Sequence, residues 1–387
     1  MTRQQDLPVV ESHRFVEWFA GRIDDPVIRL RFLKAVAPRS LQHTRRLRGW
    51  RYALPLLVLA ASLSFFLVRA AVRVEPLPVR LHPPQPPLSL QVQGVPDVWQ
   101  VDQGVDSETY SNGLRVDNSF AVLNHPRSYA VYPVEHPEQT GERRFEPAGI
   151  VFHTTESHQA PFQAKQSNTL KRIGESLLEY VRRRRAYNFL IDRFGRVYRI
   201  VAESDAAQHA GYSVWADGKW LYVNLNESFL GVSLEAETHP GQVDAAISPA
   251  QVRAASMLTE MLRSRYAIPA SNCVTHAQVS VNPLNMRVGY HTDWASSFPF
   301  EEVGLPDNYL QPLPAVWAFG FEFDPSFQQQ AGSRIYIAAQ RGEEALRERS
   351  AAAGVAQAAY RRALQRRYRE RFGEVRHHPA DEADAPE

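Results

Sequence analysis

The sequence of 387 residues is poor in several features that mark large classes of protein. It contains one cysteine, Cys273, so no disulfide can form within the chain. Its 44 lysines and arginines nearly balance 42 aspartates and glutamates, whereas a nucleic-acid-binding protein is expected to show a basic excess. The sequence therefore excludes a disulfide framework and predicts no nucleic-acid partner. Its length is sufficient for one large domain or two small ones.

Long apolar runs are also scarce, and only residues 52–68 (YALPLLVLAASLSFFLV) form an uncharged one. A spanning helix needs about 17–25 residues, and Arg69 can snorkel so that the span extends to Val72. Eight basic residues lie between positions 29 and 51, against three between 69 and 80. The positive-inside bias therefore predicts a cytoplasmic segment at 1–51, one uncleaved transmembrane anchor at 52–72, and the rest of the chain outside the cytoplasm. A buried helix of a soluble protein is the alternative.

The chain after the anchor divides by composition. Residues 73–94 are rich in proline, which predicts an extended linker that cannot build a core. Residues 95–147 contain short β-like pieces, and they could form either the edge of the next domain or a wrap around it.

From residue 148 the hydrophobic pattern predicts alternating strands and helices. Strands are expected at 148–155, 229–237 and 272–276, with a hairpin at 187–201. Helices are expected at 164–185 and 248–268, the second with Ser248 as N-cap and Pro249 at its first position. The predicted fold is therefore an α/β domain at 148–305, with a central mixed sheet flanked by helices.

The C-terminal part is predicted as an extension at 306–340, a single basic helix at 341–373 and a disordered tail at 374–387. The basic face of this helix could contact a membrane or an anionic polymer. The alternative is a solvated helix with intrahelical charge pairs.

Candidate metal ligands stand at the predicted strand ends. His153 follows the apolar residues AGIVF in 148-AGIVFHTT-155, and His276 closes 272-NCVTH-276. His291 and Asp293 lie in 291-HTDWASSF-298. Residues two apart in an extended chain point the same way, so His291 and Asp293 are expected to face one space. Two imidazoles and one carboxylate with an open position are a common arrangement for catalytic zinc.

Several blocks occur in the order found in zinc-dependent N-acetylmuramoyl-L-alanine amidases, and the segment from about 148 to 300 resembles this family. Its wider relatives are phage amidase-lysozymes and peptidoglycan recognition proteins. The blocks are AGIVFHTT, YNFLIDRFGRVYRI, QHAG, N-x-x-x-x-GVSLE, the helix that starts SPAQ, VTH and HTDWASSF.

The resemblance implies roles for individual residues. His153, His276 and Asp293 correspond to the zinc ligands, and Tyr187 corresponds to a tyrosine close to the reacting water. His209, Asn226 and Ser233 are expected to bind substrate.

His291 and Ser233 depart from the family pattern. His291 replaces a lysine that stabilises an oxyanion, which histidine can do as a cation or as a neutral donor. If the cation is required, activity should fall as the pH rises through about 6.5. His291 could instead be the third zinc ligand, with Asp293 as the hydrogen-bond partner of its imidazole. Ser233 stands where many family members have a glutamate that is a candidate general base, so Glu235 is the expected substitute, with Glu156 as the alternative. Both glutamates could instead be solvated surface carboxylates.

The resemblance thus predicts zinc-dependent hydrolysis of the amide between N-acetylmuramic acid and L-alanine, in peptidoglycan or muropeptides. The alternative is a module that binds these molecules without cutting them. With the predicted anchor, the expected location is a bacterial inner membrane, with the N-terminus in the cytoplasm and the α/β domain in the periplasm or cell-wall space. The sequence identifies no protein partner.

Overall fold

The computed structural model describes residues 94–139, 141–238, 247–323 and 326–373, which belong to one compact unit. The predicted cytoplasmic segment, the anchor, the linker up to residue 93 and the C-terminal tail lie outside the described residues. Among the helices of the described ranges, none combines the length and the apolar character that crossing a membrane requires.

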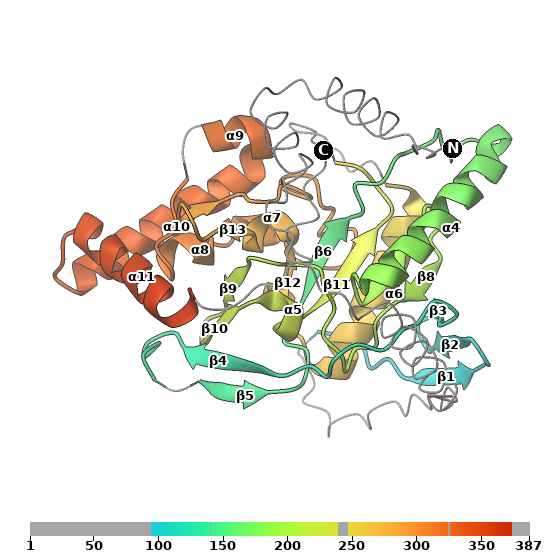
Figure 1. The fold of residues 1–387 in the computed structure, drawn as a ribbon, viewed down its shortest axis with the longest axis horizontal. Coiled ribbons are helices and arrows are strands. Elements are labelled where there is room, and N and C mark those ends of the chain that lie inside the picture. The colour runs from blue at the N-terminus through green and yellow to red at the C-terminus, as the bar shows by residue number, and fades with distance from the viewer. Residues whose placement is uncertain (1–93, 140, 239–246, 324–325, 374–387) are drawn as a thin grey trace, which may run out of the picture. The chain divides into compact units, whose positions relative to one another are not determined.

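A mixed sheet of eight strands forms the centre of the unit, in the order β1-β2-β3-β8-β7-β11-β6-β12 (Figure 1). The strand β6 is parallel to both of its neighbours, β11 and β12, whereas β2 is antiparallel to both of its neighbours, β1 and β3. The central mixed sheet predicted from the sequence is therefore confirmed. Its strands are β1 (Gln100–Gln103), β2 (Ser107–Tyr110), β3 (Arg115–Asp117), β6 (Gly149–Thr154), β7 (Phe189–Ile191), β8 (Val197–Arg199), β11 (Phe229–Leu234) and β12 (Cys273–Thr275).

Two long helices, α4 (Ser167–Arg184) and α6 (Pro249–Tyr266), cover opposite faces of this sheet. Successive strand residues point to opposite faces, so Leu190 packs in the cluster of α4 while its neighbours Phe189 and Ile191 pack in that of α6. Because both faces are covered, every residue of β6 and β11 is buried.

The predicted start of the second helix is confirmed in its details. Ser248 accepts a hydrogen bond from the Gln251 backbone N–H, and the Gln251 side chain accepts one from the Ser248 backbone, while Pro249 is the first helical residue. This capping box satisfies backbone donors that would otherwise lack partners at the helix start.

The segment before residue 148 forms an edge of the main sheet and also part of a second sheet. Strands β1, β2 and β3 extend the main sheet beyond β8, whereas β4 (Tyr129–Pro133) and β5 (Glu142–Arg144) join β9 (Val214–Ala216) and β10 (Trp220–Val223) in a second, antiparallel sheet. The boundary expected at residue 148 thus does not separate two packed parts.

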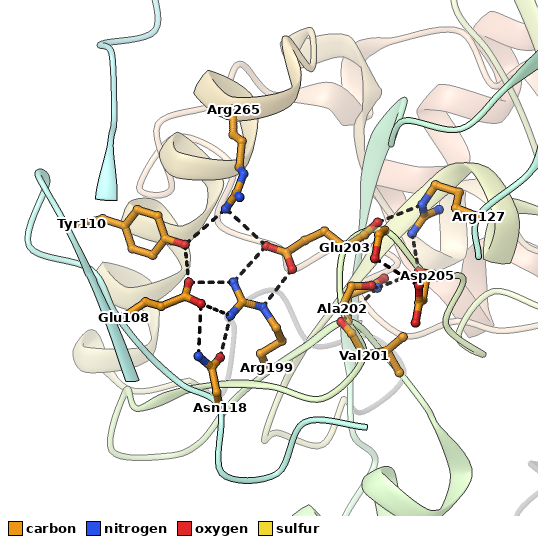
Figure 2. Close-up of polar contacts among 12 residues, drawn as sticks. Glu108, Tyr110, Asn118, Arg127, Arg199, Val201, Ala202, Glu203, Asp205 and Arg265 are labelled. Carbon is orange, nitrogen blue, oxygen red and sulfur yellow. Dashed lines mark hydrogen bonds and ion pairs between the residues drawn. The ribbon is translucent and has the colours of Figure 1, made fainter. Parts of the chain in front are cut away.

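A buried polar cluster ties the edge strands to the main sheet (Figure 2). Arg199 of β8 donates to Glu108 of β2 at 2.9 and 3.1 Å and to Glu203 at 2.8 and 3.0 Å. Asn118 and Tyr110 complete the hydrogen bonding of Glu108. Opposite charges that are removed from water need such complete pairing. The cluster therefore specifies how β1, β2 and β3 pack beside β8.

A second buried cation, Arg127, lies between β3 and β4 and binds backbone carbonyls of other segments. Its guanidinium donates to four backbone carbonyls, which belong to Glu203, Asp205, Glu227 and Phe229. Burial lowers the pKa of Arg127 to about 10, so the side chain remains a cation at neutral pH.

The prediction of a single basic helix at 341–373 is wrong, and so is the alternative that such a helix is solvated on all sides. The chain forms α10 (Ser333–Ala352) and α11 (Gln357–Phe372), and Gly354 between them has φ +66°. The Val355 N–H donates a hydrogen bond to the Ser350 carbonyl and so closes a six-residue turn. Helices commonly end in such a turn where a glycine takes a left-handed conformation. Both helices pack inward, since Ile335, Tyr368 and Phe372 belong to one apolar cluster with Phe319 and Phe321.

The remaining elements are short connections. They are η1 (Ala164–Gln166), α5 (Leu225–Ser228), η2 (Ala270–Asn272), α7 (His276–Val279), β13 (Val281–Asn282), β14 (Arg287–Val288), η3 (Asn308–Leu310), α8 (Pro314–Trp317) and α9 (Ser326–Ala331).

Candidate metal centre and its cleft

Three potential ligands converge at the carboxyl ends of the parallel strands. His153 is the fifth residue of β6, His276 directly follows the neighbouring strand β12, and Asp293 lies in the loop after β14. One ligand atom from each of them lies within 4.8 Å of the others. The edge where parallel strands end is a common position for ligand sites, and the predicted group is assembled there.

The carboxylate of Asp293 faces both imidazoles. Its Oδ1 lies 2.7 Å from His276 Nδ1, and its Oδ2 lies 3.4 Å from His153 Nδ1. Burial alone would raise the pKa of Asp293, but the two histidines hold it well below its usual range. Burial and the nearby His276 lower the pKa of His153 to about 4. A neutral imidazole and an ionised carboxylate are the protonation states that metal binding requires.

His291 lies against His276 rather than among the three converging groups. The two rings are stacked, with centroids 4.6 Å apart and an interplanar angle of 21°. Lone pairs of imidazole nitrogens lie in the ring plane, so nearly parallel stacked rings do not direct them to one ion. This geometry favours Asp293 over His291 as the third ligand. Burial, followed by the nearby His276, lowers the pKa of His291 to about 4, which favours the neutral donor over the cation.

The three groups open into a cavity of about 530 Å³. Tyr187, His209 and His291 line it, as do the half-exposed residues Tyr180 of α4 and Tyr290 of the loop after β14. Tyr187 packs beside His153 with ring centroids 5.1 Å apart, and its φ of +63° lies in the left-handed region. Bulky side chains adopt this conformation at a cost, which the surrounding structure must offset.

The two candidate general bases have different positions. Glu235 is buried, its carboxylate accepts the Arg193 backbone N–H at 3.1 Å, and it is not among the residues lining the cavity. Burial raises its pKa. Glu156 does line the cavity, and its carboxylate accepts hydrogen bonds from Thr154 and Thr238. Of the two glutamates, the structure therefore places Glu156 in the lining of the cleft and does not bring Glu235 into it.

Ser233 and Asn226 also lie outside the cavity lining. Ser233 is the register partner of His153 in the neighbouring strand and is fully buried, and among the described residues its hydroxyl has no hydrogen-bond partner. Asn226 accepts the backbone N–H groups of His209 and Ala210 at 2.8 and 2.6 Å, so it holds the loop that carries His209.

Sequence reasoning missed Arg127 and the part played by Asn226. Neither has a local motif, because their partners are backbone carbonyls or N–H groups that only the folded chain brings close. The N-x-x-x-x-G spacing in the block that starts at Asn226 was the one available signal, and its meaning depends on the loop of His209.

The part of the chain that carries these residues is similar to known proteins. Residues 143–293 match the family described as N-acetylmuramoyl-L-alanine amidase, Amidase_2. The amidase AmiD of Escherichia coli K12 is 30% identical over 89 residues, which are 22% of this chain and 31% of AmiD. The chain thus matches less than a third of the length of this relative.

Solved structures of amidases are similar at lower identity. A complex of AmiD from E. coli with an anhydro-N-acetylmuramic acid tripeptide is 18% identical, covering 70% of this chain and 100% of that one, with a TM-score of 0.34. AmpDh3 from Pseudomonas aeruginosa with an anhydromuramic pentapeptide is 21% identical, covering 41% and 58%, with a TM-score of 0.30. Both scores are low, so the fold assignment rests on the strands and helices described above.

Proposed function

Residues 143–293 belong to the N-acetylmuramoyl-L-alanine amidase family, and on this premise we propose that the chain hydrolyses the amide between N-acetylmuramic acid and L-alanine in peptidoglycan or muropeptides, with zinc as its cofactor. The observation that supports this most strongly is the convergence of His153, His276 and Asp293 in the lining of one cleft.

The donor set fits a zinc ion. Two imidazole nitrogens and one carboxylate are zinc ligands, and three protein ligands leave a position for substrate or water, as in catalytic sites. When bound, zinc would supply a Lewis acid for the scissile carbonyl and make a water molecule more acidic.

The other residues of the cleft have distinct tasks in this proposal. Tyr187 and the neutral ring of His291 donate hydrogen bonds to the carbonyl oxygen as negative charge develops on it. Glu156 accepts the proton of the attacking water and returns it to the L-alanine nitrogen as the amide breaks. The exposed rings of Tyr180 and Tyr290 offer apolar faces on which sugar and peptide can pack.

The test uses the full chain and a defined muropeptide. We expect release of a peptide that begins with L-alanine, measured by mass spectrometry, with loss after chelation and recovery when zinc is added back. His153→Ala should lower turnover at least about 1,000-fold and weaken zinc binding, because one of three ligands is lost.

His136→Ala is the matched control, since this histidine is exposed and pairs only with the exposed Glu138 among the described residues. Tight muropeptide binding by the zinc-loaded wild type, without any cleavage, would replace the amidase by a binding module that senses the same molecules.

The location is part of the same proposal. A single-pass anchor at residues 52–72 would place the described unit in the periplasm or cell-wall space, within reach of its substrate. Fractionation should then find the chain in the inner membrane, and a protease added from the periplasmic side should digest the unit. Recovery of all of the chain in the soluble fraction would contradict the anchor.

A further inference from the structure

His209 connects the candidate ligand His153 to a backbone carbonyl. Its Nδ1 lies 3.1 Å from His153 Nε2, and its Nε2 lies 3.3 Å from the Phe229 carbonyl oxygen. The two contacts use both nitrogens of the His209 ring. The order of atoms is therefore Phe229 carbonyl, His209 Nε2, His209 Nδ1, His153 Nε2.

The carbonyl at one end decides where the protons lie. A carbonyl oxygen can only accept, so the proton of a neutral His209 ring is on Nε2 and its Nδ1 carries a lone pair. His153 Nε2 must then donate to that lone pair, which leaves His153 Nδ1 without a proton. This Nδ1 is the atom that faces Asp293 Oδ2 at 3.4 Å.

We propose that His209 is a positioning residue that sets the tautomer of His153, so that its Nδ1 lone pair is directed at the metal position beside Asp293. This inference rests on the proposed metal centre and gives His209 a role different from the substrate binding expected from the sequence.

The contact of His153 with Asp293, at the other end of this chain of contacts, requires the same tautomer of His153. A lone pair on His153 Nδ1 and the anionic oxygen of Asp293 repel each other unless a cation lies between them. A metal ion satisfies both atoms and needs this tautomer, because a ligating histidine keeps its proton on the other nitrogen. The carbonyl and the metal position therefore require the same arrangement of protons.

The surroundings hold His209 in this orientation. Asn226 fixes the backbone of the residue, and Gly231 makes room for its ring, because a Cβ atom at Gly231 would lie 2.6 Å from His209 Cγ. The Phe229 carbonyl is itself held by Arg127, which donates to it at 3.0 Å. The oxygen accepts from both groups with its two lone pairs.

Two substitutions separate positioning from space filling. His209→Asn retains an acceptor attached to Cγ, where Nδ1 stands, whereas the longer side chain of His209→Gln reaches toward Phe229 and lacks that acceptor. We expect His209→Gln to lower zinc affinity about 10–100-fold and His209→Asn to recover most of the loss, measured by competition with a zinc chelator. Equal affinities of both variants and the wild type, with all three folded by circular dichroism, would overturn the proposal.

The tautomer is measured without substrate. In full-length protein with ¹⁵N-labelled histidine, long-range ¹H–¹⁵N spectra should show His209 protonated on Nε2 in both the metal-free and the zinc-loaded forms. A proton on His209 Nδ1 in the metal-free form would contradict the inference. Because neither measurement uses a muropeptide, failure of the amidase proposal would leave these results interpretable.

Discussion

Ser233 is the residue where the resemblance and the structure lead to different expectations. The resemblance implies a carboxylate that is a candidate general base at this position, and substrate binding is the role expected of the serine. The side chain is fully buried, however, and its hydroxyl has no partner among the described residues. A buried polar group without a hydrogen bond costs about 1–3 kcal/mol. The hydroxyl of Ser233 therefore lowers the free energy of unfolding.

Replacement of this hydroxyl gives a prediction at the residue scale. Ser233→Ala should raise the free energy of unfolding by about 1 kcal/mol, measured by urea denaturation, since it removes the unpaired group with little change in volume. Muropeptide cleavage should stay within about twofold of the wild type. A large loss of cleavage would instead show that the hydroxyl contacts substrate.

At the element scale, the buried cluster around Arg199 decides how the first three strands dock. Burial would raise the pKa of Glu108, but the charge of Arg199 and its hydrogen bonds outweigh this and lower it below 4.5. Folding thus favours the ionised carboxylate of Glu108. Its contribution to the free energy of unfolding is fully present above pH 4.5 and is lost as the pH falls through the lowered pKa of the folded state.

Glu108→Gln tests this contribution. At pH 7 the variant should lose about 2 kcal/mol of unfolding free energy, since hydrogen bonds to a charged group are removed while Glu203 still pairs with Arg199. The difference from the wild type should shrink as the pH is lowered below 4.5. The exposed Glu135→Gln is the control, and a difference that is constant with pH would contradict the assigned ionisation.

At the scale of the whole molecule, the C-terminal helices are part of the packed unit. Tyr368 of α11 is 4% exposed and contacts the rings of Phe319, Phe321 and Phe372. The apolar cluster that it joins also contains Val281 and Met286, which belong to the hairpin before the cleft loop. The helices therefore support the loop that carries His291 and Asp293.

Tyr368→Ala should destabilise the unit by about 3 kcal/mol, because a large buried aromatic side chain is lost and a cavity remains. We expect a lower melting temperature and weaker zinc binding near that temperature, measured by calorimetry with and without the metal. Ile337→Ala on α10, where the side chain is 42% exposed, should have little effect. Equal melting temperatures of the two variants would show that α11 does not support the core.

The sequence by itself determined the parts that depend on local pattern. The helix that starts at Ser248 follows from its capping residues and apolar spacing, and β6 and β11 follow from continuous apolar runs. The candidate ligands His153 and His276 follow from their positions at strand ends, and Asp293 follows from the order of the family blocks.

Only the tertiary structure decided which side chains meet. Ser233 and Glu235 lie on one predicted strand, yet one is the register partner of His153 and the other accepts a hydrogen bond from Arg193 outside the cleft. The relation of His209 to His153 joins residues 56 positions apart through a carbonyl on a third segment. Such contacts depend on strand order and on the relative placement of loops, which burial of the whole core selects and no local pattern encodes.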